Sequence, residues 1–205
     1  MLAVDDVISS PQERDAIASS LRDFSEVAAT LAAPWALIGG HALIAHGVPR
    51  YSPDLDLLVA DDRIRPVVAV LVSGFGWARL QPHQQANRPL ILRRRAESLQ
   101  VNLHPARGKI SCEAIARPVM REHCSVPVPV ARLGAVLLML LAADRVIDRA
   151  AIEQTVGHLR RPALRDALDW ATKRSPELGA KLRAIMDNAR APRFSLRPPR
   201  LGRRK

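Results

Sequence analysis

Three adjacent stretches decide how this chain folds, and they read Leu37-Ile38-Gly39-Gly40-His41-Ala42, then His46-Gly47-Val48-Pro49-Arg50, then Ser52-Pro53-Asp54-Leu55-Asp56-Leu57-Leu58-Val59. The apolar run at 35–38 predicts a buried strand, and the glycine pair after it predicts a tight turn. A short helix over 41–46 is expected next, closed by Gly47. In the second strand, Asp54 and Asp56 alternate with leucines, so both carboxylates are expected on one face.

This arrangement predicts a site for a nucleotide and a metal ion. Main-chain N–H groups at Gly39, Gly40 and His41, at the positive end of a helix, suit a triphosphate. Two carboxylates one residue apart on a strand, Asp54 and Asp56, suit a hard cation, typically Mg²⁺. Metal, triphosphate and a positioned hydroxyl together are the machinery of in-line nucleotidyl transfer.

The whole string, GG-x-A-x₃-HG-x₂-R-x-S-x-D-x-D, resembles the nucleotidyltransferase superfamily that includes DNA polymerase beta. Within it, the string is similar to small bacterial nucleotidyltransferases of the abortive-infection type IV toxin group. The resemblance implies that the glycine pair opens the phosphate-binding helix and that Asp54 and Asp56 bind the catalytic metals. It also implies that Arg50 and Ser52 shape the rim of the site, with Arg50 neutralising the pyrophosphate leaving group.

The sequence departs from this family at two places. The family usually has a third carboxylate on a later strand, and Asn102 stands at that position here. An asparagine can coordinate a metal through its carbonyl oxygen but cannot accept a proton. Glu97 is an alternative third ligand, and His104 is an alternative base. Relatives also carry a lysine in the helix after the sheet, where this chain has Met139.

The order of predicted elements gives an α+β fold, and the resemblance specifies a nucleotidyltransferase-type mixed β-sheet flanked by helices. Helices are expected over 10–32, 63–73, 133–143, 149–159 and 162–173, with a last one beginning at 175–177. Strands are expected at 90–93 and 99–104, joined as a hairpin by 95–98. We expect a nucleotidyltransferase-like domain over 1–130, a helical part over 131–187 and a disordered basic tail over 188–205.

Charge and cysteine content narrow the classes of partner. The 205 residues carry 31 Lys+Arg against 20 Asp+Glu, a net charge of +11, and seven of the positive charges follow Asp187. This balance suits a polyanionic partner such as RNA or a nucleoside triphosphate.

The longest apolar run, Leu133 to Ala143, is too short to cross a bilayer. Two cysteines, Cys112 and Cys124, make no disulfide scaffold, and no secretory signal is visible, so a cytoplasmic location is expected.

Two functions remain open from the sequence. The first is transfer of a nucleoside monophosphate from an NTP to an acceptor, with Mg²⁺ as cofactor. The resemblance implies RNA, such as tRNA ends, as acceptor, and a toxin-like role with a cognate antitoxin; an aminoglycoside acceptor is less favoured. The second is a degenerate, non-catalytic protein of the same fold that binds nucleotide or RNA, because the third carboxylate and the lysine are both missing.

Overall fold

The structure is a computed structural model, and it describes residues 10–80, 88–94 and 97–190. Its elements, in chain order, are α2 (Pro11–Thr30), β1 (Trp35–Ile38), α3 (Gly39–Ala45), β2 (Asp54–Ala60), α4 (Ile64–Gly74), β3 (Trp77–Arg79), β4 (Leu90–Arg94), β5 (Gln100–Ala106), α5 (Lys109–Ala116), β6 (Val119–His123), β7 (Val126–Val130), α6 (Leu133–Ala143), α7 (Val146–His158), α8 (Arg161–Arg174) and α9 (Pro176–Arg190). The α+β fold expected from the sequence is confirmed.

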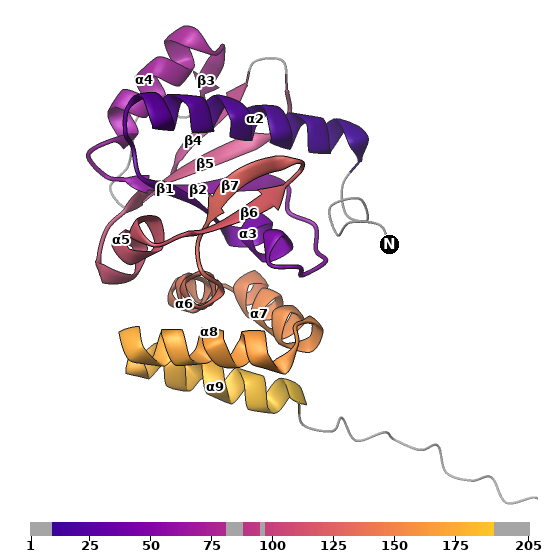
Figure 1. Cartoon of the computed structure of the whole chain (residues 1–205). Coiled ribbons are helices and arrows are strands. Elements are labelled where there is room, and N and C mark those ends of the chain that lie inside the picture. Colours follow the sequence, from indigo (N-terminus) through magenta and orange to yellow (C-terminus); the bar gives the residue numbers. More distant parts are fainter. Residues whose placement is uncertain (1–9, 81–87, 95–96, 191–205) are drawn as a thin grey trace, which may run out of the picture.

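A mixed sheet of seven strands forms the centre of the described chain, in the order β3-β4-β5-β2-β1-β7-β6. β2 runs parallel to β5 and antiparallel to β1, while β7 runs parallel to β1. All four residues of β1 are buried, as expected of a central strand covered on both faces. In Figure 1, α2 and α4 lie on one side of the sheet, and the C-terminal helices lie on the other, with α8 and α9 farthest from it.

The helices α2 and α6 are held in place in different ways. α2 begins with a capping box between Ser10 and Glu13, with Pro11 in its first turn, as the sequence predicts. Its inner face buries Leu21 and Phe24. α6 is apolar nearly all round because it is enclosed between the sheet side and the other C-terminal helices. No helix among the described residues is long and apolar enough to cross a membrane.

Several expectations about the elements need correction. The helix predicted over 41–46 begins at Gly39, two residues earlier, so the glycine pair forms its first turn. α7 begins at Val146 and not at 149. The predicted 90–93 and 99–104 strands do pair antiparallel, but residues 95–96 of their connection lie outside the described residues. Most of the expected basic tail, residues 191–205, also lies outside them, while α9 extends to Arg190.

Two parts of the sheet and one helix have no counterpart in the expectations. These are the edge strand β3, the hairpin of β6 and β7, and α5. The hairpin turns at Cys124 and Ser125, which have φ values of +48° and +60°. Turns of this kind usually contain glycine or asparagine, so a turn at Cys124 and Ser125 could not be predicted. Pro127 and Pro129 lie within β7 and also argue against a strand in the sequence, because proline is rare inside sheets.

Candidate active site

The register of the parallel strands β2 and β5 assembles the polar centre of the molecule. Asp54 lies opposite Gln100, and Asp56 lies opposite Asn102. Asp54 and Asp56 alternate with the fully buried Leu55 and Leu57, so both carboxylates face the same side of the sheet, as predicted. Asn102 is 6% exposed and extends from β5 on this side. Two carboxylates and an amide from separate parts of the chain are therefore brought together.

Asn102 contacts both carboxylates as a hydrogen-bond donor. Its Nδ2 donates to Asp54 Oδ2 at 2.8 Å and to Asp56 Oδ1 at 3.0 Å. Its Oδ1 accepts a hydrogen bond from Gln100 Nε2 at 3.0 Å, which fixes the direction of the amide. The expectation that Asn102 could present its carbonyl oxygen to a metal is not the arrangement seen, because the oxygen is turned toward Gln100.

The carboxylate pair is electrostatically strained. Burial raises the pKa of Asp54 above its ordinary value, and the neighbouring charge of Asp56 raises it further. The hydrogen bond from Asn102 opposes this shift, and so does the nearby His104. His104 Nε2 lies 2.9 Å from Asp56 Oδ1, so the histidine is held at the edge of the site. A cation placed between the two carboxylates would relieve their repulsion.

The glycine pair approaches the carboxylates so closely that side chains do not fit. A Cβ atom at Gly39 would lie 2.2 Å from Asp56 Oδ2, and one at Gly40 would lie 2.3 Å from Ser52 Oγ. The positive φ of Gly39 also disfavours any other residue there. α3 starts without a side-chain cap, because its N-cap residue is Ile38, which has no polar side chain. This turn, the glycine cradle, therefore lies directly against Asp56 and Ser52.

His41 contributes no side chain to this cradle. It is 1% exposed, and its Nδ1 lies 2.9 Å from His123 Nε2, so the imidazole ring packs between α3 and the β6–β7 hairpin. Any contact of His41 with a nucleotide would therefore come from its main-chain N–H. The histidine pair instead anchors the start of α3 to the far edge of the sheet.

Cations face the carboxylates from two directions. The Arg50 Nε is buried without a hydrogen-bond partner among the described residues, and it would lie 3.6 Å from a Cβ at Gly40. Burial lowers the pKa of Arg50, and the charges of Asp148 and Asp54 oppose that shift. Ser52, two residues along the same loop, donates to the main-chain oxygen of Asp54 at 3.3 Å. Both rim residues expected from the sequence therefore lie beside the glycine pair.

The second cation is Arg145, which begins the R-x-x-D string Arg145-Val146-Ile147-Asp148. Its Nε and Nη2 donate to Asp148 Oδ2 and Oδ1 at 2.7 and 3.0 Å, and Asp148 is 3% exposed. Asp148 raises the pKa of Arg145, and Asp56 and Asp54 add to that rise. α7 is tied to the loop that carries Arg50, because Gln154 Nε2 donates to Pro49 O at 2.6 Å. Met139, where the family has a lysine, packs against the core.

Glu97 does not join the carboxylate pair. Its Oε1 accepts from Ser19 Oγ at 2.9 Å and from Arg94 Nη1 at 2.7 Å, and its Oε2 accepts from Ser20 Oγ at 3.4 Å. These contacts hold Glu97 against α2, so the idea that it replaces the third carboxylate is wrong for this arrangement. Over residues 10–80, 88–94 and 97–190, no group of three or more His, Cys, Asp or Glu side chains is close enough to hold a metal ion.

The residues present still fit one Mg²⁺ ion. Mg²⁺ is commonly held by one or two carboxylates, with substrate phosphates and water completing its octahedron. Asp54 and Asp56 supply such a pair, and their mutual repulsion favours a cation. A second ion fits less well, because the third position carries a neutral amide that points its N–H groups at the carboxylates.

Comparisons with known proteins support the fold. No protein-family model matches the sequence, and no sequence of a characterised protein matches it. Among solved structures, the antibiotic-resistance factor ANT(2'')-Ia is 18% identical, with 88% of this chain and 94% of that chain covered and a TM-score of 0.51. An antigenic nucleotidyltransferase-like protein from Paracoccidioides brasiliensis is 16% identical, with 86% and 94% covered and a TM-score of 0.51. The chain is thus similar in fold to nucleotidyltransferases.

Proposed function

We propose that this protein transfers a nucleoside monophosphate from an NTP to a hydroxyl group of an acceptor, with Mg²⁺ as cofactor. The observation that carries the proposal is the closeness of the glycine cradle to the carboxylate pair. A Cβ at Gly39 would overlap Asp56 Oδ2, so a phosphate lying on the turn would lie next to a metal held by Asp56. Triphosphate and metal sites that adjoin in this way are what in-line nucleotidyl transfer needs.

Each residue of the site has a role in this proposal. Asp54 and Asp56 would hold Mg²⁺, which would stabilise the charge that develops on the phosphate oxygens. Gly39, Gly40 and the main-chain N–H of His41 receive the β- and γ-phosphates. Arg50 and Arg145 offset the negative charge that grows on the leaving pyrophosphate. Ser52 fixes the loop that carries Arg50 against the start of β2.

The proposed reaction is a displacement at the α-phosphorus of the NTP. The acceptor oxygen forms a bond to this phosphorus, and the bond between the phosphorus and the bridging oxygen breaks. Pyrophosphate leaves with that electron pair, and the acceptor's proton passes to solvent. Asn102 cannot take the proton, because an amide has no basic site at neutral pH. A general base typically contributes about 10²–10⁴-fold, so we propose that transfer by this chain is slow.

A second candidate function is nucleotide binding without catalysis. The observation that favours it is the double hydrogen bond from Asn102 Nδ2, which already links Asp54 and Asp56 where relatives of the resembled family have a third carboxylate. On this alternative, the cradle and the cations still hold an NTP, but the acceptor is never activated.

The finer expectations concern the acceptor and the biological role. RNA or tRNA as acceptor, a toxin-like role and a cognate antitoxin rest on the sequence resemblance and on the basic residues after Asp187. We keep them as hypotheses that are separate from the proposed reaction, since nucleotidyl transfer needs only the cradle, the carboxylates and a hydroxyl.

The test is a transfer assay with the full chain. Each of the four NTPs, labelled at the α-phosphate, is incubated with the protein, Mg²⁺ and either total tRNA or a small-molecule extract. The proposal expects slow, Mg²⁺-dependent release of pyrophosphate and transfer of label, both absent in an Asp54→Asn/Asp56→Asn variant. NTP binding without any transfer would favour the non-catalytic alternative, and absence of both would refute the proposal.

A further inference from the structure

Gln100 contacts the Asn102 amide from the side opposite the two carboxylates. The two residues are two positions apart on β5, so both side chains lie on the same face of the sheet. Gln100 is paired with Asp54 in the strand register, but its Nε2 donates to Asn102 Oδ1, at 3.0 Å. Gln100 therefore acts on the carboxylate pair through Asn102.

The direction of the Asn102 amide follows from the groups around it. Ionised carboxylates only accept hydrogen bonds, so Asn102 turns its NH₂ group toward Asp54 and Asp56. The amide oxygen then points the other way and needs a donor, which Gln100 Nε2 supplies. The donor at position 100 and the two acceptors at positions 54 and 56 thus favour the same orientation of the amide.

The Asn102 nitrogen occupies the oxygens that a metal ion shared by the two carboxylates would use. It donates to Asp54 Oδ2 and to Asp56 Oδ1, one oxygen of each carboxylate. A cation that bridges these oxygens would have to displace the NH₂ group. The amide could offer its oxygen to that cation only by turning over, which would break the hydrogen bond from Gln100.

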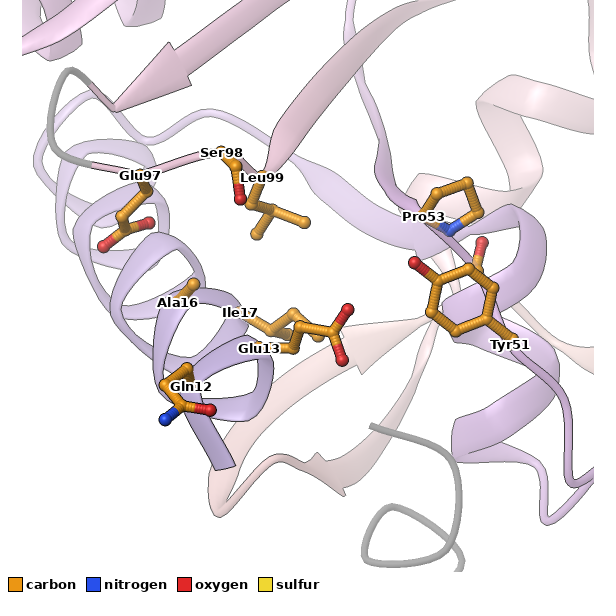
Figure 2. A pocket seen from close by; sticks show the side chains of 10 residues that line it. Gln12, Glu13, Ala16, Ile17, Tyr51, Pro53, Glu97, Ser98 and Leu99 are labelled. Carbon is orange, nitrogen blue, oxygen red and sulfur yellow. The ribbon is translucent and has the colours of Figure 1, made fainter. Parts of the chain in front are cut away.

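Glu97, which precedes β5, does not replace the missing ligand. Figure 2 shows its side chain turned toward α2. There Ser19 Oγ and Arg94 Nη1 donate to Glu97 Oε1 at 2.9 and 2.7 Å. Whether this part of β5 offers a third oxygen to a metal ion therefore depends on the direction of the Asn102 amide, which Gln100 holds.

This network affects free Mg²⁺ and nucleotide-bound Mg²⁺ differently. Mg²⁺ loses its water reluctantly and usually combines one or two carboxylates with substrate phosphates. Free Mg²⁺ would have to displace the Asn102 hydrogen bonds with only the two carboxylates as new ligands. Mg²⁺ that arrives with NTP brings phosphate oxygens as well, and the triphosphate adds its own contacts with the glycine cradle. These additional interactions offset the hydrogen bonds that are lost.

We infer that Gln100 is a positioning residue that holds the Asn102 nitrogen against Asp54 and Asp56, so that the site binds Mg²⁺ together with NTP and takes up little free Mg²⁺. The inference rests on the proposed function, because Mg·NTP is the substrate there. It extends that function by assigning the choice between free and nucleotide-bound metal to a residue that acts through Asn102.

Titration with Mn²⁺ tests the inference by binding alone. Electron paramagnetic resonance measures the free Mn²⁺ in solutions of the full chain, without nucleotide and with the α,β-methylene analogue of each NTP. We expect at least one analogue to raise the Mn²⁺ affinity of the wild type at least about tenfold. Gln100→Met removes the donor at similar length and without a change of charge. It should raise the affinity for Mn²⁺ alone about fivefold, the effect of one hydrogen bond.

Two further variants show whether Gln100 acts through Asn102. Asn102→Ala removes the competing NH₂ group and should raise the affinity for Mn²⁺ alone, whereas loss of a carbonyl ligand would lower it. In the Asn102→Ala background, Gln100→Met should have no further effect, because the amide is gone. Gln12→Met, the same substitution at an exposed position of α2, is the control and should leave the Mn²⁺ affinity unchanged.

The results that overturn the inference differ from those that overturn the proposed function. Unchanged affinity for Mn²⁺ alone in Gln100→Met, a full Gln100→Met effect in the Asn102→Ala background, or lower affinity in Asn102→Ala would overturn the inference. If no analogue raises the Mn²⁺ affinity of the wild type while the effect of Gln100→Met is as expected, the proposed function is refuted instead.

Discussion

Asn102 donates a hydrogen bond to Asp54 across 2.8 Å, at the centre of the polar site. The same nitrogen donates to Asp56, so the amide partly substitutes for a cation between the two carboxylates. For Asn102 to present its oxygen to a metal, the amide would have to turn over and give up these bonds and the one from Gln100. Metal binding must therefore compete with this hydrogen-bond network.

Arg145→Gln should weaken binding of Mg·NTP more than binding of NMP. Arg145 is oriented by the buried Asp148 and faces the carboxylates, so it contributes to the charge that receives the β- and γ-phosphates. A loss of roughly 1.5–3 kcal/mol is typical for a charged hydrogen bond. Isothermal titration with NTP and NMP measures it, and Arg149→Gln, an exposed neighbour on the same helix, is the control. Equal losses for NTP and NMP would show that Arg145 does not contact those phosphates.

Gly40→Val should weaken Mg·NTP binding at least about tenfold, or 1.4 kcal/mol. A side chain there would occupy the space of the phosphates and would also collide with Ser52. Ser52→Gly in the same chain removes the collision, so the double variant should recover stability but not NTP affinity. Gly74→Ala, where a Cβ meets nothing within 4 Å, is the control. Full NTP affinity in the folded double variant would rule out the phosphate cradle.

Asp54→Asn should stabilise the metal-free protein at neutral pH. Burial and Asp56 raise the pKa of Asp54, so the folded protein holds that proton more tightly than the unfolded chain does. The raised pKa therefore stabilises the folded wild type below the ordinary aspartate pKa of about 3.9. This stabilisation is lost as pH rises through the folded-state pKa of Asp54. The higher free energy of unfolding of Asp54→Asn, relative to the wild type, should therefore appear only above that pH range.

Chemical denaturation in EDTA at several pH values measures this advantage. Asp61→Asn is the control, because Arg107 lowers the pKa of the exposed Asp61, so any effect should have the opposite sign. An advantage of Asp54→Asn that is constant with pH would show that the carboxylate is not destabilised by its surroundings.

Much of the site geometry could be predicted because it depends on local sequence. Alternation along β2 placed Asp54 and Asp56 on one face, and the glycine pair after an apolar strand indicated a turn with open N–H groups. The role of Asn102 as a donor could not be predicted. It depends on Gln100, which fixes the amide direction, and on a strand register that only the folded sheet defines.

The place of Arg145 beside the carboxylates could not be predicted for a different reason. Arg145 lies 89 positions after Asp56 in the chain, and it reaches the site because α7 is tied to the Pro49 loop by Gln154. Contacts between distant segments depend on packing, which periodicity does not encode.

Deletion of residues 191–205 should lower RNA affinity and flatten its salt dependence. The segment carries six Lys and Arg residues and no acidic residue. If all six neutralise phosphates of single-stranded RNA, the slope of log K against log salt should fall by up to about four. Filter binding to tRNA from low to high salt measures this slope. An unchanged slope would show that the segment does not contact RNA.

The most direct test of the account compares nucleotidyl transfer by wild type, Asn102→Asp and Asp56→Asn across a Mg²⁺ titration. An aspartate at position 102 would add the missing negative charge and a group able to accept the proton of the acceptor hydroxyl. The account predicts that Asn102→Asp raises turnover and lowers the Mg²⁺ concentration needed, while Asp56→Asn abolishes transfer. A robust wild-type rate that falls in Asn102→Asp would contradict it.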